Sequence, residues 1–354
     1  MAALNHRPQT IVRAARAGEG AAIAVLWREL WEAHERWGGY PGSRDPRVYG
    51  HLAARLEEDA RMRAGNPTLG RHVHLVAEHD GKLCGQVEGW LDHQGNESST
   101  PQSCDVRSLI VSAGVRRAGV GRELLSALAV AARRRHGDSV LAAEVLEPNP
   151  AHAFYARVGY VPVAYSARIA VTDGARAAGD SRAAGLTARR AVPADALALA
   201  CLESTLAARR RAAGDTRFER PRAIDATLLA AIAAYLAAEG AARDPATLVV
   251  VDATGVVRGS ASFAMHALEP PFLPARRALL GRVALDPASA VLPLFAPMAA
   301  LACQLALVDG ASHLEMTDLS APPTDLYRAA LAVGANPWSR IVMRHAAQDT
   351  PQKC

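Results

Sequence analysis

The segment from Val111 to Arg122 carries the clearest chemical pattern in the chain. It lies between a β-prone run and an amphipathic helical pattern, and its sequence is Val111-Ser-Ala-Gly-Val-Arg116-Arg117-Ala118-Gly119-Val120-Gly121-Arg122. Backbone amides at a helix N-terminus, next to glycines that let a ligand approach the chain, can hold a phosphate group. The spacing differs from G-x-G-x-x-G and lacks the G-K-[ST] of a P-loop. The segment therefore predicts an anion site that is not a dinucleotide or triphosphate site.

A second pattern follows about 30 residues further on, after a β-prone run from Val140 to Leu146. Its sequence is Asn149-Pro-Ala-His-Ala-Phe154-Tyr155-Ala-Arg-Val-Gly159-Tyr160, which predicts a short helix that ends at a glycine. A tyrosine hydroxyl can act as a general acid toward a leaving group. The alternative role for Tyr155 is that of an aromatic residue of the core.

In this order and at this separation, the two patterns resemble the acetyl-CoA-binding core of the GNAT superfamily of N-acetyltransferases. The resemblance extends over about residues 10 to 171. It implies that the amides from Arg117 to Arg122 and the Arg116 side chain bind the pyrophosphate, and that the pantetheine arm lies between two splayed strands, 106–111 and 140–146. It also implies that Asn149 binds this arm and that Tyr155 donates a proton to the departing thiolate.

The resemblance thus implies acetyl-CoA as co-substrate, while the scattered cysteines, which lack a Cys/His spacing, predict no metal. The residues expected to contact acetyl-CoA are Leu109, Ile110, Val111, Arg116, Arg117, Ala118, Gly119, Val120, Gly121, Arg122, Asn149, Ala153 and Tyr155.

Transfer of an acetyl group to an amine requires a group that removes a proton from the acceptor ammonium. Three carboxylates on predicted strands compete for this role, in the order Glu144, Asp105, Glu88. For each of them, a solvated or ion-paired residue at a strand end is an equally good interpretation. Cys104 has no histidine in a recognisable arrangement with it, which argues against a cysteine nucleophile.

Aromatic residues gather near the end of the first predicted helix, in a chain with only 5% aromatic residues. In the family, the first helices and the loop between them shape the acceptor site. We therefore expect the acceptor to contact Trp31, His34, Trp37 and Tyr40. Ordinary packing of an amphipathic helix is the alternative, above all for Trp31.

The elements that position these residues follow from hydrophobic periodicity. Helical patterns cover 23–37, 49–63 and the stretch that begins near Leu124, and Asp80-Gly81 predicts a hairpin between 72–78 and 83–91. The remaining β-prone runs of this half are 10–14, 106–111, 140–146, 160–163 and 167–171. We expect an α/β (α+β) fold with a mixed, mostly antiparallel, splayed sheet flanked by helices.

The second half repeats this order of elements. The predicted domains are 1–171, a catalytic GNAT domain, and 186–354, a GNAT-like domain, joined by a small, polar, glycine-dotted linker at 172–185. After Leu285-Asp286-Pro287 the second half has neither the glycines nor the arginine of the first. We therefore expect two tandem GNAT-like domains, the second degenerate, without acetyl-CoA binding and packed against the first.

Composition narrows the class of protein. The 354 residues are 50% hydrophobic and 21% charged, which is typical of globular domains. The five cysteines show no zinc or disulfide spacing, and the formal charge of +5 comes without aromatic residues among the basic clusters. We expect no nucleic acid and no membrane as partners, since no signal segment and no apolar stretch near ~20 residues stands out. The cytoplasm is the expected location, and a monomer or homodimer the expected state.

The sequence therefore predicts an acetyl-CoA-dependent N-acetyltransferase. We expect it to act on a primary amine of a small molecule, such as an antibiotic or a natural-product intermediate, by direct attack in a ternary complex. A protein or peptide N-acetyltransferase and an enzyme similar to mycothiol synthase are the alternatives within the enzymes. A non-catalytic acyl-CoA-binding interaction protein is the alternative of another class.

Overall fold

The computed structural model divides the chain into two compact units, Met1–Val161 with Val342–Cys354, and Pro162–Ile341. The structure describes residues 10–38, 45–65, 72–92, 102–136, 139–176, 185–215, 223–241, 245–267, 275–320 and 325–345.

The first unit is built on a sheet whose order is β1-β2-β3-β4-β5, followed by the end of β12. Antiparallel pairs join β1 to β2, β2 to β3 and β3 to β4, while β4 and β5 are parallel. Asp80 and Gly81 make the predicted hairpin turn, both with positive φ. The strands are β1 (Thr10–Ala14), β2 (His72–His79), β3 (Lys82–Asp92), β4 (Gln102–Val111), β5 (Ser139–Leu146) and β12 (Asn336–His345).

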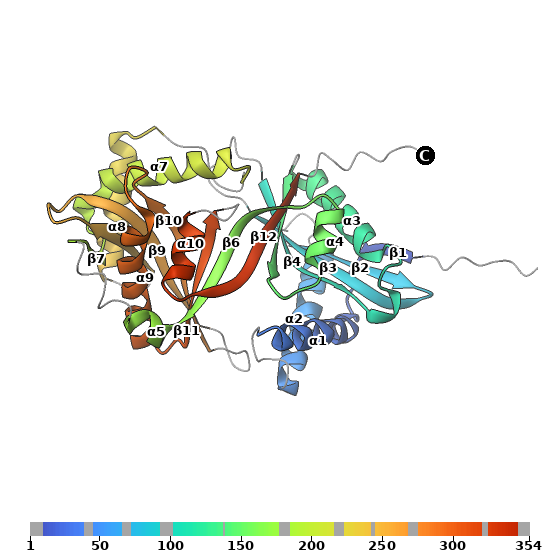
Figure 1. Ribbon diagram of the computed structural model, residues 1–354. Helices are drawn as coiled ribbons and strands as arrows, with labels where there is room; N and C mark the ends of the chain where they lie inside the picture. The colour runs from blue at the N-terminus through green and yellow to red at the C-terminus, as the bar shows by residue number, and fades with distance from the viewer. Residues whose placement is uncertain are drawn as a thin grey trace, which may run out of the picture. The chain divides into compact units, whose positions relative to one another are not determined.

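Helices cover both faces of this sheet (Figure 1). On one face, α1 (Gly20–Arg36) and α2 (Pro46–Gly65) pack against Val76 and Ile110. On the other face, α3 (Val120–His136) and α4 (His152–Arg157) pack against strand residues such as Val73 and Val87. Because side chains alternate along a strand, each strand residue of this unit can be assigned to the α1/α2 face or to the α3 face.

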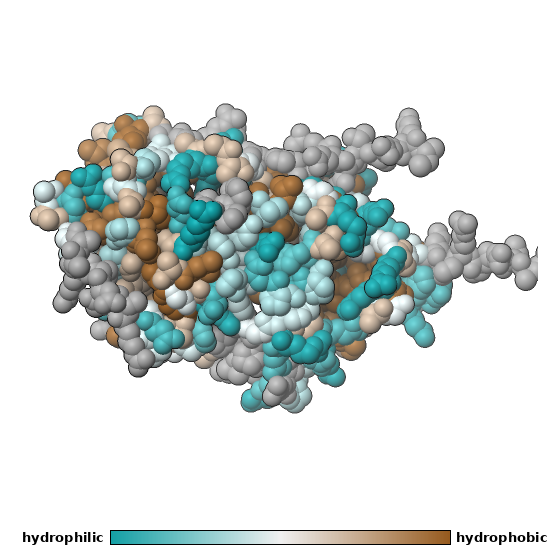
Figure 2. Space-filling model, in the orientation of Figure 1, coloured by the Kyte–Doolittle hydropathy of each residue, from teal (hydrophilic) through white to brown (hydrophobic). Residues whose placement is uncertain are grey.

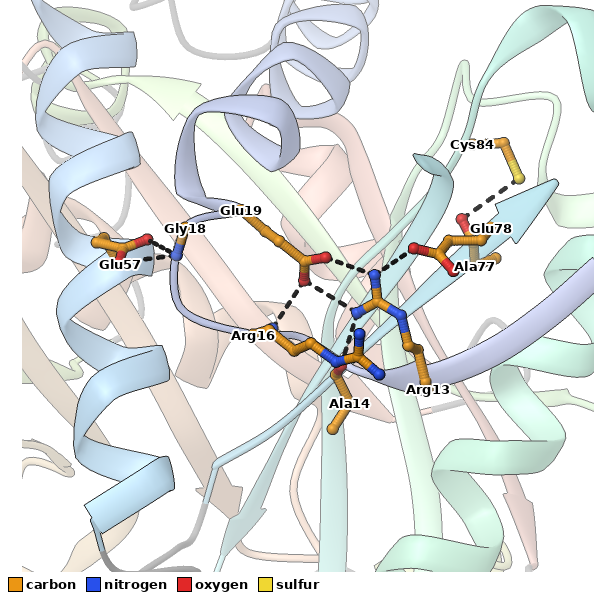
Figure 3. Close-up of polar contacts among 9 residues, drawn as sticks. All are labelled: Arg13, Ala14, Arg16, Gly18, Glu19, Glu57, Ala77, Glu78 and Cys84. Atoms are coloured by element: carbon orange, nitrogen blue, oxygen red, sulfur yellow. Dashed lines mark hydrogen bonds and ion pairs between the residues drawn. The ribbon is translucent and has the colours of Figure 1, made fainter. Parts of the chain in front are cut away.

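Polar contacts hold α1 and α2 in place on their face (Figure 3). The Arg13 guanidinium on β1 pairs with Glu19 before α1 and with Glu78 on β2, and both carboxylates have a lowered pKa. For Glu19, the hydrogen bonds from Arg13 and the Arg16 amide outweigh the opposing effect of burial. The Gly18 amide donates to the Glu57 carboxylate of α2 at 2.7 and 2.9 Å. Strand β1 and both helices are thereby tied together.

The second unit has a sheet of order β6-β11-β10-β9-β8-β7, with β12 as the further neighbour of β6. Its main core lies between these strands and α9 and α10, and smaller clusters join α7 and α8 to the opposite face. The elements are β6 (Val161–Ala170), α5 (Val171–Arg176), β7 (Thr187–Arg190), η3 (Pro193–Asp195), α7 (Ala196–Ala212), α8 (Ala226–Ala241), β8 (Ala246–Val251), β9 (Val257–Ala267), β10 (Arg276–Leu285), α9 (Val291–Val308), β11 (His313–Ser320) and α10 (Asp325–Ala332).

The predicted α/β class and the repeated order of elements are confirmed. The two compact units have different boundaries from the predicted domains. Strand β6 pairs with β11 and belongs to the second unit, and the chain from Val342 onward belongs to the first unit. The start of the predicted linker forms helix α5, where Gly174 lies so close to Cys303 that no side chain would fit. The boundaries 1–171 and 186–354 stay a prediction about the repeated units.

Helix α9 differs from the expectation that no apolar stretch near ~20 residues stands out. Its 18 residues carry no charge, and α9 is the one helix in the described part of the chain that is long and apolar enough to cross a membrane. Half of it is buried, and nine of its residues pack inside the second unit. Figure 2 shows more hydrophobic groups over this unit, where α8, α9 and α10 lie, than over α1 to α3. The contacts of α9 are those of a core helix.

We predict that Gly20→Ala destabilises the first unit. A Cβ at Gly20 would lie 2.4 Å from the Ala53 carbonyl oxygen and 3.2 Å from the Glu57 nitrogen of α2, so the two helices would have to separate. Such overpacking costs about 1–3 kcal/mol. Gly50→Ala on α2 is the matched control, because a Cβ there meets nothing within 4 Å and should stabilise by about 0.5–1 kcal/mol. Thermal unfolding checks both variants, and a Gly20→Ala protein as stable as the unchanged chain contradicts this packing.

Candidate active site

Strands β4 and β5 part in the middle of the first unit's sheet. Their parallel pairing runs from Gln102 opposite Ser139 to Val106 opposite Ala143 and then stops, although β4 continues to Val111 and β5 to Leu146. A bulge of β4 against β3 falls at the same level, since Glu88 pairs with Ser108 and Gly89 with Val106. This is the splayed arrangement expected from the sequence, and it leaves one edge of β4 open from residue 107 onward.

The open edge of β4 presents backbone amides. The Ser112 amide donates to the Cys84 carbonyl of β3 at 2.8 Å. Because successive peptide groups in a strand point to opposite sides, the backbone groups of Val111 and Leu109 point toward the opening. The Val111 carbonyl there accepts a hydrogen bond from Arg116 Nε at 2.9 Å. The amides of Leu109 and Val111 are therefore directed to the place where a ligand could pair with β4 as an added strand does.

The loop from Ser112 to Gly121 joins this edge to α3. After the short helix η1 (Ala113–Val115), Arg117 and Gly119 adopt positive φ angles of 72° and 92°. Within the described part of the chain, the amides of Arg117, Gly119, Val120 and Gly121 have no backbone partner. Four amides at the N-terminus of α3 are thus available to an anion.

Two residues of this loop, Arg116 and Gly121, have contacts within the first unit. Arg116 is exposed, but its guanidinium is placed by the Val111 carbonyl and lies 3.7 Å from Glu29 of α1, so it holds the loop as much as it faces a ligand. A Cβ at Gly121 would meet the Phe154 ring at 3.2 Å. The glycine at 121 is therefore required by the approach of α3 to α4.

Asn149 begins the turn that leads into α4. Its Oδ1 accepts a hydrogen bond from the Ala151 amide at 2.9 Å, and His152 Nε2 lies 2.9 Å from the Leu146 carbonyl. The carbonyl oxygen of the Asn149 side chain thus has a structural role, which leaves its Nδ2 group to bind a ligand. Ala153 is exposed on the same short helix.

Tyr155 is buried, and its ring meets the Phe154 and Tyr160 rings edge to face, with centroids 5.4 and 5.1 Å apart. It belongs to the core on the α3 face. Burial raises the pKa of the Tyr155 hydroxyl, so this group stays protonated at neutral pH. The structure is compatible with both interpretations of Tyr155, as a core residue and as a general acid. Its ring packs in the core, and its hydroxyl carries a proton that it could donate.

The three candidate carboxylates for the base share one face of the sheet. Val87, Val106 and Val145 point into the α3-side core, so Glu88, Asp105 and Glu144 lie on the α1/α2 face. Glu144 is exposed and is the first residue of β5 beyond its pairing with β4. Asp105 is partly exposed and lies 3.8 Å from Arg107.

Glu88 is in a different environment, since only 4% of the residue is exposed. Its Oε1 lies 2.8 Å from His72 Nε2, and its Oε2 accepts a hydrogen bond from Ser108 at 3.3 Å. Burial alone would raise the pKa of Glu88, but the hydrogen bond with His72 and the nearby charges of His74 and Arg55 lower it to about 2. A carboxylate with this pKa is a weak base, and Glu88 is better suited to hold a positive charge.

Of the predicted acceptor residues, Trp31 and His34 lie on α1, and Trp37 directly follows the end of this helix. Trp31 packs against the core between α1 and α2, with its ring 5.4 Å from Trp27 and 5.8 Å from Tyr49. The His34 ring lies 5.6 Å from that of Trp37, and burial lowers the pKa of His34. Tyr40 lies outside the described residues. The structure thus gives Trp31 a packing role, while His34 and Trp37 form a half-buried pair at the end of α1.

The corresponding strands of the second unit also part, and a side chain of that unit donates a hydrogen bond at this place. The pairing of β10 with β11 ends at Leu280 opposite Met316. The buried Arg210 of α7 donates to the Asp318 carbonyl at 3.0 Å in the bulge that follows. Before α9, the Asp286 carboxylate accepts hydrogen bonds from the Ala288 amide and the Ser289 hydroxyl. Asp286 thus places a carboxylate before α9, whereas the loop before α3 in the first unit has amides that are available to an anion.

Comparison with known proteins agrees with this geometry. The model of the acetyltransferase (GNAT) family matches residues 26–160, which contain the opening, the loop and α4. A GCN5-related N-acetyltransferase from Sphaerobacter thermophilus is similar in fold, with a TM-score of 0.53 at 16% identity over 95% of this chain and 96% of that one. A GCN5-related glucosamine N-acetyltransferase region of a fungal multi-domain GH3 β-N-acetylglucosaminidase gives 0.54 at 13% identity, over 96% of this chain and 38% of that one.

A tandem GNAT protein from the clavulanic acid biosynthesis pathway is also similar, with a TM-score of 0.49 at 16% identity over 96% of this chain and 99% of that one. No curated protein matches the sequence. Residues 26–160 thus match the acetyltransferase (GNAT) family, and the solved structures show that the chain has a GNAT-type fold.

We predict that the contribution of Glu88 to stability depends on pH. Its pKa in the folded chain, about 2, lies below the ordinary value of 4.5, so the ionised carboxylate stabilises the fold above about pH 4.5. This contribution, about 3 kcal/mol, is lost as the pH falls toward 2. Glu88→Gln should therefore melt well below the unchanged chain at pH 7, and the gap should narrow below pH 4.

The control is Glu58→Gln, because Glu58 is exposed and reaches only Arg61 at 4.0 Å. Its melting temperature should follow that of the unchanged chain at every pH. A gap between Glu88→Gln and the unchanged chain that stays constant from pH 7 to pH 3 would show that charge is not the reason for the stabilisation.

Proposed function

We propose that the first unit binds acetyl-CoA in the opening between β4 and β5 and transfers the acetyl group to a primary amine of a small molecule in the cytoplasm. The observation that carries this proposal is the end of β4–β5 pairing at Val106 and Ala143, directly beside a loop with four amides that have no backbone partner. Acetyl-CoA supplies the activated acetyl group in GNAT enzymes, and its amide-bearing arm and pyrophosphate match these two sets of donors.

The residues of this chain fit that co-substrate in order along the opening. The Leu109 and Val111 amides pair with the arm, and Asn149 Nδ2 contacts it from the start of α4. The amides from Arg117 to Gly121 hold the pyrophosphate, assisted by the helix dipole of α3. A phosphate oxygen that replaces the contact between Arg116 and Glu29, now 3.7 Å long, would bring the guanidinium into the site.

Proton transfer accompanies the reaction at two places. The acceptor ammonium loses one proton to Glu144, which is exposed on the α1/α2 face at the opening, and its nitrogen then forms a bond to the acetyl carbon. The carbon–sulfur bond breaks, and the Tyr155 hydroxyl protonates the departing thiolate. The nitrogen then loses its second proton to the Tyr155 phenolate, which restores the Tyr155 hydroxyl. Asp105, on the same face, is the second candidate for the base.

The direct test is release of coenzyme A thiol from acetyl-CoA by the full chain, in the presence of amino sugars, diamines, amino acids and small peptides. We expect a rate with one class of small primary amine, together with an acetylated product of the corresponding mass. Turnover with peptides alone would favour a protein or peptide acetyltransferase. Tight acetyl-CoA binding without turnover on any amine would favour a binding protein.

We predict that Gly119→Ala weakens acetyl-CoA binding by about tenfold or more. Gly119 has φ 92°, which an alanine adopts only with strain of about 1–2 kcal/mol, so the amides of the loop would move. Gly114→Ala in the same loop is the matched control, because a Cβ there meets nothing within 4 Å. Calorimetry should give one acetyl-CoA per chain for the unchanged protein and the control, and equal affinities for both variants contradict the placement of the pyrophosphate.

We predict that Glu144→Gln lowers kcat by about 10²–10⁴-fold and leaves acetyl-CoA affinity unchanged, because a general base acts on the acceptor alone. The rise of the rate with pH should flatten in this variant. Asp105→Asn, which removes a charge from the same face, should retain most of the activity. Equal losses of kcat in both variants, or full activity in Glu144→Gln, would show that Glu144 is not the general base.

A further inference from the structure

Asp59, His72 and Glu88 meet on the α1/α2 face of the first unit. They come from three elements, α2, β2 and β3, and a carboxylate oxygen of Asp59, a ring nitrogen of His72 and a carboxylate oxygen of Glu88 lie within 4.8 Å of one another. Among the described residues, this is the one such group of three. We propose that these side chains bind a divalent transition-metal ion, of which Zn²⁺ is the representative.

The donor set selects this class of ion. One imidazole nitrogen with two carboxylate oxygens suits Zn²⁺, Co²⁺ or Mn²⁺, whereas Mg²⁺ and Ca²⁺ prefer oxygen ligands alone. Cys84 and Cys104 point into the core on the other face of the sheet, so thiolates do not take part. Three protein ligands also leave a position for water or another ligand, as in sites where zinc is not purely structural.

The distances are compatible with coordination. His72 Nε2 and Glu88 Oε1 are 2.8 Å apart, within ion-pair distance. With metal–ligand bonds of about 2.0–2.2 Å, tetrahedral ligands lie about 3.3 Å from each other, so the two side chains need to separate by only about half an ångström. Asp59 is half-buried on α2 and completes the set from the side of the helices.

The surroundings hold the ligands in place. Ser108 donates to Glu88 Oε2, and Gln86 links Ser108 to His74 with hydrogen bonds of 2.8 Å. The Trp90 ring stacks on His72, with centroids 5.0 Å apart and planes 24° from parallel. Outer contacts of this kind fix the orientation of ligands, and they commonly contribute 10–100-fold to metal affinity.

This inference departs from the expectation that the protein uses no metal. That expectation followed from the absence of Cys/His spacing motifs, whereas here the ligands are brought together by three separate elements. The metal would tie α2 to β2 and β3, next to the level at which β4 and β5 part. The inference stands apart from the proposed acetyl transfer, because neither Asp59 nor His72 has a role in it.

The test uses the full chain, treated with a chelator and then titrated with Zn²⁺ by calorimetry and with Co²⁺ by visible absorption. We expect one equivalent of each ion and ligand-field bands of Co²⁺ at low coordination number. Asp59→Asn and His72→Gln should each weaken binding by more than about tenfold, since loss of a ligand exceeds the loss of an outer contact. His51→Gln on the exposed side of α2 should bind as the unchanged chain does.

Melting temperatures measured without metal establish that each variant is folded. If His72→Gln fails to fold, the loss of metal affinity is tested with Asp59→Asn. Acetyl-CoA binding, measured on the same samples, tells failure of this inference from failure of the proposed function. Absence of a stoichiometric ion, or equal binding by the unchanged chain and Asp59→Asn, overturns the metal site. In that case Asp59, His72 and Glu88 form a polar cluster without a metal ion.

Discussion

The parting of β4 and β5 is the constraint on which the rest of the first unit depends. Inside a sheet, a strand edge without a partner leaves amides and carbonyls unsatisfied, and these groups need another strand, water or a ligand. The bulge at Ser108, the turn through η1 and the start of α3 follow directly from that opening, and they bring the Leu109 and Val111 amides beside those of the loop. A ligand with its own amides and an anionic end satisfies both sets at once.

In the second unit, side chains make hydrogen bonds at the corresponding positions. Its β10 and β11 also separate, but Arg210 donates to the carbonyl of Asp318, and Asp286 accepts the amide that precedes α9. Side chains thus supply hydrogen bonds at positions where, in the proposed function, a ligand supplies them in the first unit. This gives a physical reason for the expected degeneracy, and it accounts for a buried arginine that would otherwise be costly.

The local patterns of the sequence predict most elements, because Asp80-Gly81, the glycines of the loop and the helical periods act over a few residues. No local pattern predicts helix α8, since its alanine-rich apolar run lacks an amphipathic period. Strand β6 belongs to the second unit, while the end of β12, with Val342, belongs to the core of the first unit. This arrangement depends on long-range strand pairing, which no local pattern of the sequence predicts. The same holds for Asp59, His72 and Glu88, whose meeting follows from three elements that pack together.

Hydrogen exchange measured with and without acetyl-CoA tests the central claim most directly, because it reports on the backbone amides themselves. The account predicts slower exchange on addition of acetyl-CoA in 107–111 of β4 and in 117–121 of the loop. It predicts no change in the corresponding stretches of the second unit, 281–285 and the first turn of α9. Protection confined to the second unit, or none in β4, would contradict it.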